Sequence, residues 1–269
     1  MNFTYDGNGN THTIDNGSTL WTYNYDYNNR LTSVEDNSVT VATYSYDGSG
    51  MLVHSVEKDT ETYAYNAGNR IYAKNTGTGS VVDYFYGDGM ILASANGTTT
   101  DYFHEDALGS VRLETSSSEA TLFSADYRPY GPTYGATASV AFGYTGKPTD
   151  AATGLYYSGA RFYDPASGRF MTQDSSTGSQ TAPLTLNRYI YACDDPMSVV
   201  DPTGHFGMPP PDMAKGNESE PDHRDHQLVE RTAACGQGRH CRSGGGSGGR
   251  SNMRSRRCRG RRVGSICSD

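Results

Sequence analysis

Tryptophan, evenly spaced cysteines and long apolar runs are scarce or missing in this 269-residue sequence, and each absence excludes a class of protein. No run of about 18 apolar residues occurs, which excludes a membrane-spanning helix. The first residues, MNFTYDGNGN, have neither the basic start nor the apolar stretch of a secretory signal peptide. Of the five cysteines, Cys193 stands alone in residues 1–205 and the other four have no paired C-x-x-C spacing. We therefore expect no metal site and no cofactor.

Tyrosine and glycine, by contrast, are abundant. The chain has 21 Tyr and 32 Gly beside one Trp. This composition favours short strands joined by tight turns over helices, which prefer Ala, Leu and Glu. The sequence therefore predicts a mainly β fold.

Charge and composition change sharply after the segment DPMSVVDPTGHF, residues 195–206. Residues 1–205 carry 10 basic and 23 acidic side chains, whereas residues 206–269 carry 12 basic and 7 acidic ones and no tyrosine. The second part contains GGGSGG and then seven arginines between Arg250 and Arg262. Too few apolar residues are present there to offset the entropy lost on folding, so we expect a disordered tail.

A repeat of about twenty residues organises the first hundred residues. The units are FTYDGNGN, YNYDYNNRL, YSYDGSGML, YAYNAGNRI, YFYGDGMIL and YFHEDALGS. The second aromatic position of each unit falls at Tyr5, Tyr25, Tyr46, Tyr65, Tyr86 and, with an imidazole instead, His104. A fixed period in this range is the signature of a repeat architecture.

Each unit has the pattern of a β-hairpin. An aromatic-x-aromatic strand is followed by a turn rich in Asp, Asn and Gly, and then by a short returning strand. We interpret Asp6, Asp26 and Asp47 as turn caps in preference to calcium ligands. The tyrosines are interpreted as structural, and a sugar-binding or base-stacking platform is the alternative.

The units resemble the YD repeats of RHS proteins, wall-associated bacterial toxins, insecticidal toxin C subunits and teneurins. Four later segments, in order and spacing, resemble the RHS repeat-associated core. They are YFHEDALGSVRLET, ADYRPYGPTYG, FGYTGKPTDAATGLYYSGARFYDPASGRFMTQD and NRYIYACDDPMSVVDPTG. The resemblance covers about residues 3–204.

The resemblance implies an architecture and a set of partners. Repeats in this family coil as a spiralling strip of β-sheet into a shell, a core segment plugs one end, and a variable C-terminal polypeptide is held inside as cargo. It thus implies YD repeats in residues 1–104, an RHS core in 105–205 and a variable tail in 206–269. It also implies an immunity protein or secretion machinery as partners and a secreted or cell-surface location. Because six hairpins are few for a closed container, we expect this chain to be the C-terminal part of a longer toxin-delivery protein.

The resemblance further implies self-cleavage by a pair of carboxylates. The family pattern carries over to Asp174 and Asp201 as the dyad and to Arg161 as the arginine beside them. Two carboxylates that share one proton can activate water and polarise a carbonyl, and the arginine can orient a carboxylate or stabilise an oxyanion. The structural alternative is an Arg161–Asp174 ion pair inside a closed core.

By the same resemblance, the bond to be cut lies between His205 and Phe206. His205 stands where the family usually has leucine, and a pocket for leucine accepts imidazole less well.

Two other hypotheses stay open. The repeats are a non-enzymatic surface or adhesion module, or the arginine-rich tail is an effector that targets nucleic acid through phosphate contacts. For the tail itself, an inactive extension and an out-of-frame remnant are further readings. Its histidine and cysteine side chains at His223, His226, His240 and Cys241 are interpreted as incidental and not as zinc ligands.

Overall fold

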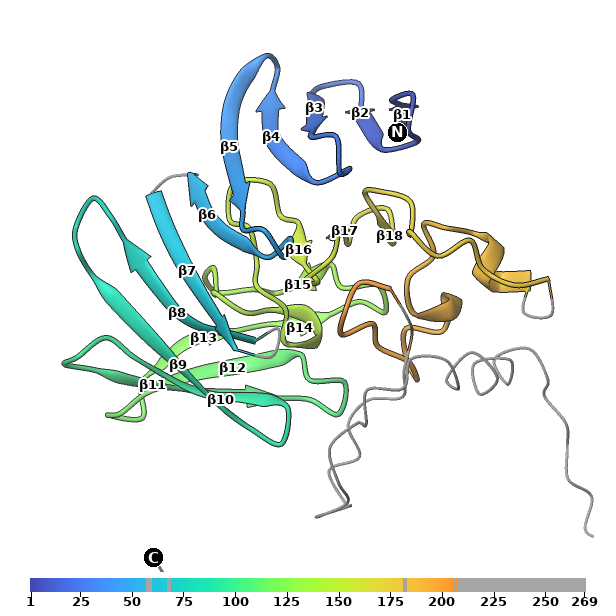
Figure 1. The fold of residues 1–269 in the computed structure, drawn as a ribbon. Helices are drawn as coiled ribbons and strands as arrows, with labels where there is room; N and C mark the ends of the chain where they lie inside the picture. Colours follow the sequence, from blue (N-terminus) through green and yellow to red (C-terminus); the bar gives the residue numbers. More distant parts are fainter. Residues whose placement is uncertain (57–59, 67–68, 181–182, 206, 208–269) are drawn as a thin grey trace, which may run out of the picture. The chain divides into compact units, whose positions relative to one another are not determined.

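One long antiparallel sheet dominates the computed structural model, which describes residues 1–56, 60–66, 69–180, 183–205 and 207 (Figure 1). All of these residues belong to one compact unit, Met1–Gly236. The sheet has 13 strands, and each strand pairs with its neighbours in sequence. The strands are β1 (Asn2–Tyr5), β2 (Thr11–Asp15), β3 (Leu20–Tyr25), β4 (Leu31–Asp36), β5 (Val39–Tyr46), β6 (Leu52–Val56), β7 (Thr60–Asn66), β8 (Asn69–Asn75), β9 (Val81–Gly87), β10 (Met90–Ala95), β11 (Thr100–Glu105), β12 (Val111–Ser116) and β13 (Thr121–Ser124).

A second segment of the chain, which we call the closing segment (residues 125–205), has little regular structure. It contains the short strand pair β14 (Asp126–Tyr127) and β15 (Thr133–Tyr134). A three-stranded sheet follows, made of β16 (Tyr156–Tyr157), β17 (Phe162–Asp164) and β18 (Arg169–Phe170). Three short 3-10 turns complete it: η1 (Tyr144–Gly146), η2 (Pro183–Leu186) and η3 (Ala192–Asp194).

The turns of the repeats are held by the aspartates that follow the tyrosines. Asp26 Oδ1 accepts hydrogen bonds from the backbone N–H groups of Asn28 and Arg30, each at 2.9 Å. Asp6, Asp47 and Asp106 repeat this pattern with the residues two and four positions after them. Such bonds stabilise a tight turn without help from distant residues.

In three of the repeats, the tyrosine at the end of the outgoing strand ties its hairpin to the preceding one. Tyr25 donates from its hydroxyl to the backbone carbonyl of Thr11 at 2.8 Å, and Tyr46 donates to that of Leu31 at 2.7 Å. Tyr86 makes the same bond to Arg70 at 2.8 Å. The strand register shifts beside Tyr25 and Tyr46, so a bulge accompanies the tyrosine there. The repeated tyrosine is thus structural, as predicted.

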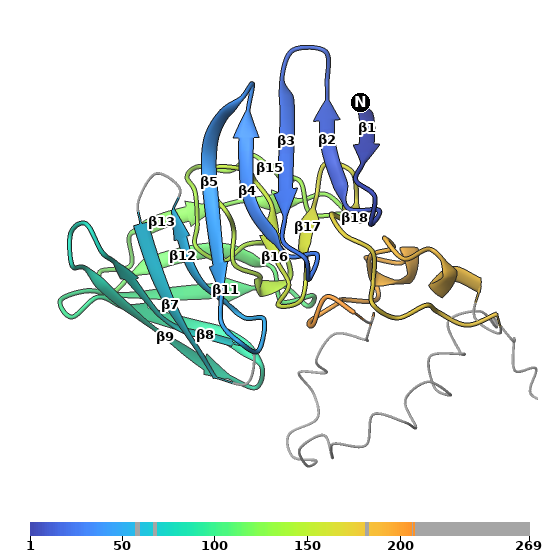
Figure 2. The ribbon, with the colours of Figure 1, turned by 45° about the horizontal axis from the view of Figure 1, so that its top comes forward.

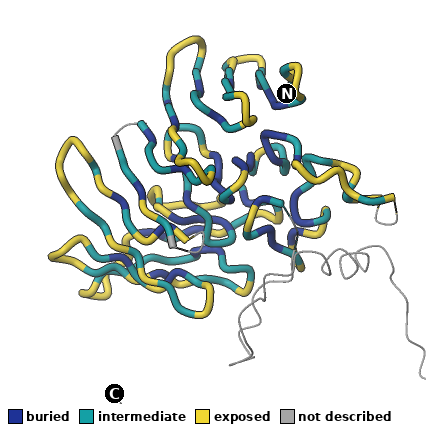
Figure 3. The backbone as a smooth tube through the Cα atoms, in the orientation of Figure 1, coloured by how far each residue is buried: buried dark blue, intermediate teal, exposed yellow. Residues whose placement is uncertain are grey.

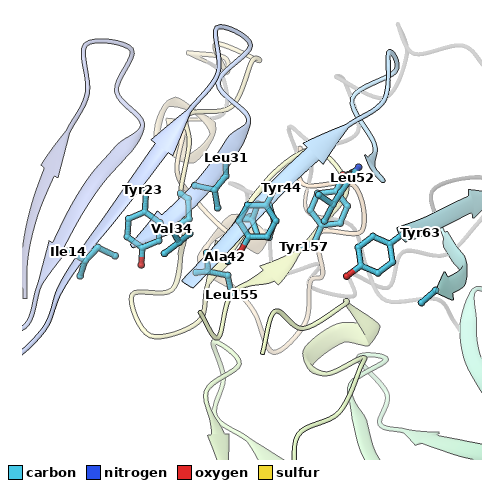
Figure 4. Packing of buried hydrophobic residues seen from close by; sticks show 13 residues of the cluster. Ile14, Tyr23, Leu31, Val34, Ala42, Tyr44, Leu52, Tyr63, Leu155 and Tyr157 are labelled. Carbon is cyan, nitrogen blue, oxygen red and sulfur yellow. Dashed lines mark hydrogen bonds between the residues drawn. The ribbon is translucent and has the colours of Figure 1, made fainter. Parts of the chain in front are cut away.

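One face of the sheet packs against the closing segment. A cluster of buried side chains from β2 to β8 includes Leu155, Tyr157, Phe162 and Met171 of that segment. Figure 4 shows Tyr44, Leu52 and Tyr63 of the sheet beside Tyr157. The hydroxyl of Tyr157 also accepts the backbone N–H of Leu52 at 3.0 Å. The order of the strands along the sheet is clearest in Figure 2, and Figure 3 shows that exposed residues gather at hairpin ends.

Phe142, also in the closing segment, packs against the later strands of the sheet. Its ring meets those of Tyr84 and Phe103 edge-on, with ring centroids 4.9 and 6.2 Å apart. Nearby, the guanidinium of buried Arg70 lies over the ring of Tyr63, 3.7 Å from its centroid. The contact is of the cation–π type, which compensates part of the cost of burying the charge.

The prediction of a mainly β fold built from repeated hairpins is confirmed. No helix among the described residues is long and apolar enough to cross a membrane. The sequence predicts disorder in residues 206–269. Of these, Phe206 and residues 208–269 lie outside the described residues.

Candidate functional site

Arg161 lies at the centre of the site, immediately before β17. Only 4% of its side chain is exposed, and its guanidinium carbon lies 3.8 Å from the centroid of the Phe170 ring on β18. One of its terminal nitrogens donates to the backbone carbonyl of Arg188 at 2.9 Å. These contacts fix the direction of a planar group that has five N–H donors.

Asp174 lies four residues after β18 and pairs directly with Arg161. The distance from its Oδ2 to Arg161 Nη2 is 2.8 Å, and its Oδ1 accepts the backbone N–H of Ser176 at 2.9 Å. Its own backbone N–H donates to the carbonyl of Arg188 at 2.8 Å, and the Arg188 guanidinium donates back to the Asp174 carbonyl. The loop that carries this carboxylate is therefore held at two backbone points.

Asp201 enters the same cluster from a loop that follows η3. It is 2% exposed, and its Oδ2 lies 4.0 Å from Arg161 Nη2, the nitrogen that also contacts Asp174. Its Oδ1 accepts the backbone N–H groups of Gly204 at 2.8 Å and His205 at 3.1 Å. One guanidinium nitrogen thus faces two carboxylates that are 27 positions apart in the sequence.

Gly204 is required by the backbone at this point. Its φ of +78° is in the left-handed region, and an added Cβ would lie 2.8 Å from the carbonyl oxygen of Ser158. Its own carbonyl accepts a hydrogen bond from Arg161 Nε. Only glycine combines this conformation with so close an approach to neighbouring backbone.

His205, the residue before the predicted cut, faces the carboxylates. Its Nδ1 lies 3.1 Å from Asp174 Oδ1, and 35% of its side chain is exposed. Phe206, on the other side of the predicted cut, lies outside the described residues. The structure therefore brings Arg161, Asp174, Asp201 and His205 into one cluster.

The electrostatics of the cluster follow from burial and charge. Burial alone would raise the pKa of Asp174, but hydrogen bonds from His205 and Ser176 and the charge of Arg161 outweigh it, so the pKa lies below its usual value. Burial lowers the pKa of Arg161, and the two aspartates oppose that change. Asp174 is accordingly ionised at neutral pH.

Lys147 belongs to this site and was not predicted from the sequence. Its Nζ donates to the backbone carbonyl of Pro202 at 2.7 Å, next to Asp201. Burial lowers the pKa of Lys147 to about 8, and Asp201 acts in the opposite direction. The available signal was its place in FGYTGKPTD, a segment that carries the resemblance, but nothing in that segment says which loop the lysine contacts.

Chemically, this arrangement offers two carboxylates, a guanidinium and a lysine around one backbone turn. Carboxylates so placed can exchange a proton with water, and the cations can stabilise negative charge on oxygen. Among the described residues, no group of three or more His, Cys, Asp or Glu side chains is arranged to hold a metal ion. The tail residues His223, His226, His240 and Cys241 lie outside the described residues.

Two family models match the chain. The one described as the teneurin YD-shell matches residues 75–197, and the one described as the RHS repeat matches residues 25–62. Together they include most of the long sheet and the closing segment through η3.

Several curated proteins are similar in sequence. The tRNA3(Ser)-specific nuclease WapA of Bacillus spizizenii is 32% identical over 214 residues, which cover 75% of this chain and 9% of that protein. Toxin subunit YenC1 of Yersinia entomophaga is 33% identical over 110 residues, which cover 38% of this chain and 11% of that protein. The chain thus spans about a tenth of the length of these relatives.

Solved structures share the fold. The crystal structure of TcdB2-TccC3-Cdc42 superposes with a TM-score of 0.58 at 23% identity, over 75% of this chain and 11% of that one. This likeness concerns the architecture of the sheet and its closing segment.

Proposed function

This chain belongs to the RHS/YD-repeat proteins, related to WapA and to Tc-toxin C subunits, and from that premise we propose that it cuts itself once between His205 and Phe206. The observation that carries the proposal is the single guanidinium nitrogen of Arg161 facing both Asp174 and Asp201. The carbonyl of Gly204, one residue before His205, accepts from the same guanidinium. The bond to be cut therefore follows directly on the backbone that this cluster holds.

In the proposed reaction, Asp174 is the base. Its lowered pKa keeps it ionised, so it can take a proton from a water molecule that attacks the carbonyl carbon of His205. The C–N bond to Phe206 then breaks, the nitrogen of Phe206 leaves with a proton, and His205 becomes a new C-terminus.

Asp201 is the acid in this scheme. Its Oδ1 accepts two backbone N–H groups, which leaves Oδ2, on the side of Arg161, as the oxygen that would carry the proton in this scheme. A carboxylic acid there can donate a hydrogen bond to the scissile carbonyl, and the charge of Arg161 stabilises the oxyanion that develops. Acid–base assistance of this kind typically contributes about 10²–10⁴-fold in rate.

The mass of the expressed chain tests the proposal. We expect a fragment that begins at Phe206 from the wild-type chain, and we expect the Asp174→Asn and Asp201→Asn variants to stay intact. Asp83→Asn is the matched control, because Asp83 is exposed on β9, in the sheet, and takes no part in the cluster. An intact wild-type chain between mildly acidic and neutral pH would contradict the proposal.

The rest of the functional assignment follows the family. We assign YD repeats to residues 1–104, the RHS core to 105–205 and the variable cargo to 206–269. The first boundary coincides with the end of β11, which spans Thr100–Glu105, and the sheet continues through β12 and β13. Encapsulation of the C-terminal segment, a partner such as an immunity protein or secretion machinery, and a secreted or cell-surface location are part of the same proposal. Action of the tail on nucleic acid would show as salt-dependent binding by residues 206–269.

A cavity on the closing segment favours one second candidate, the surface-binding module. It has a volume of about 670 Å³, and its lining includes Arg128, Tyr130, Arg169 and Tyr189. Tyrosine rings and arginines can bind a glycan by stacking and hydrogen bonding. A glycan-binding screen with the Asp174→Asn chain and its Tyr130→Ala, Tyr189→Ala derivative separates this function from self-cleavage.

A further inference from the structure

The imidazole of His205 contacts the oxygen of Asp174 to which a catalytic water would need to bind. Asp174 has two oxygens, of which Oδ2 is paired with Arg161 at 2.8 Å. The other, Oδ1, accepts the backbone N–H of Ser176 at 2.9 Å and lies 3.1 Å from Nδ1 of His205. A water that is to give its proton to Asp174 must therefore compete with this imidazole.

The imidazole is able to leave. With 35% of its side chain exposed, it reaches solvent by rotation about its side-chain bonds, whereas the backbone of His205 stays tied to Asp201 through its N–H at 3.1 Å. The contact with Asp174 can thus open without moving the backbone that carries the bond to be cut.

Charge decides how firmly the contact is held. Asp174 faces the imidazole from the loop that follows β18, and Asp201, on the loop that follows η3, accepts the backbone N–H of the same residue. Arg161, Lys147 and Arg188 approach the same loops through the hydrogen bonds described above. An imidazolium is attracted to the carboxylate of Asp174 more strongly than neutral imidazole is. Histidine side chains in general change charge in the range between pH 5 and 8.

We infer that His205 is a self-inhibitory residue, whose imidazole blocks Asp174 and slows the self-cleavage of this chain. Compared with a chain that has leucine at this position, the slowing is greater at acidic than at neutral pH. The inference rests on the proposed cut after His205. It concerns a side chain that departs from the leucine usual in the family, so it is a property of this chain.

Rates of self-cleavage between pH 5.5 and 8 test the inference in the full chain. We expect His205→Leu to cut faster than wild type at every pH, and the ratio of the two rates to fall by about two- to fivefold as the pH rises, in line with a partly exposed ion pair. Taking the ratio cancels the titration of the aspartates that both chains share. His205→Asn keeps a hydrogen-bond donor near the position of Nδ1 without a charge, so its profile should run parallel to that of His205→Leu.

His104→Leu is the matched control, since His104 is exposed on β11 in the sheet, where its Nε2 lies 3.0 Å from the hydroxyl of Thr115. Its profile should coincide with that of wild type. A ratio of His205→Leu to wild type that is constant with pH, or a slower cut by His205→Leu, would overturn the inference.

A second measurement does not depend on cleavage. In an Asp201→Asn background, the carboxyl carbon of Asp174 is followed by NMR as the pH is lowered. The hydrogen bond from His205 contributes to the lowered pKa of Asp174, so this pKa should rise in the Asp201→Asn, His205→Leu chain. A rise with no cut in any chain supports the blocking contact and refutes the proposed function, whereas an unchanged pKa refutes the contact whether or not the chain cuts.

Discussion

The long sheet and the site in the closing segment satisfy their polar groups in opposite ways. In the repeats, Asp26 bonds to backbone two and four residues away, and Arg30, its ion-pair partner, is four residues away. In the site, Arg161 bonds to Asp174 and Gly204, which are 13 and 43 residues away. The comparison teaches that a periodic sheet can be assembled from local rules, whereas the site depends on the whole closing segment being folded.

The largest expected effect is the loss of the cation of the site, and the matching loss of a cation in the repeats should be much smaller. Arg161→Met leaves Asp174 and Asp201 buried without their cation, so the free energy of unfolding should fall by about 3–5 kcal/mol and the proposed cut should be lost. Arg30→Met breaks an ion pair with roughly a quarter of each side chain exposed, and should cost at most about 1 kcal/mol. Urea denaturation of the two variants measures both, and equal losses would contradict the contrast.

A loss of similar size, without loss of the proposed cut, is expected when the packing of the closing segment on the sheet is weakened. Phe142→Ala removes a ring that is 1% exposed and packs against Tyr84 and Phe103, so it should destabilise the fold by about 3–5 kcal/mol without changing any group of the site. Thermal unfolding measures the loss, and the pH profile of self-cleavage in the folded variant should be unchanged. A shifted profile would mean that the two regions are coupled through this ring.

The tyrosine bonds between hairpins should each contribute less. Tyr46→Phe leaves the carbonyl of Leu31 without its hydroxyl partner, and we expect a loss of about 1 kcal/mol in the free energy of unfolding. Tyr27→Phe is the matched control in the turn of the preceding repeat, since Tyr27 is fully exposed. If the two substitutions cost the same, the hydroxyl bond does not hold the repeats together.

Two dependences of stability on pH, one for each region, complete the comparison. Burial raises the pKa of Glu105 in the sheet from 4.5 to about 7, so its contribution to stability is fully present below about 4.5 and is lost as the pH rises through about 7. Burial lowers the pKa of Lys147 in the site from 10.5 to about 8, so its contribution is present above about 10.5 and is lost as the pH falls through about 8.

Chemical denaturation across these two pH ranges distinguishes the groups. Glu105→Gln should flatten the curve only between about pH 4.5 and 7, and Lys147→Met only between about pH 8 and 10.5. A change outside its own range would show that the substituted side chain acts through a different group.

The sequence by itself determined the repeat. Tyr25 and Tyr46, with the aspartates that follow them, mark the turn and the bulge of their own repeats, because a strand, a tight turn and an aspartate cap are decided by residues within a few positions of one another. The mainly β architecture was therefore predictable, and so was the membership in a family whose motifs the chain carries in order.

Only the tertiary structure decided which side chains meet. The resemblance named Asp174, Asp201 and Arg161, but it implied neither that Lys147 reaches the carbonyl of Pro202 nor that His205 lies against Asp174. These contacts join loops more than thirty residues apart in sequence, whose approach depends on how the closing segment packs on the sheet. No local rule encodes such an approach, because it results from the burial of many side chains at once.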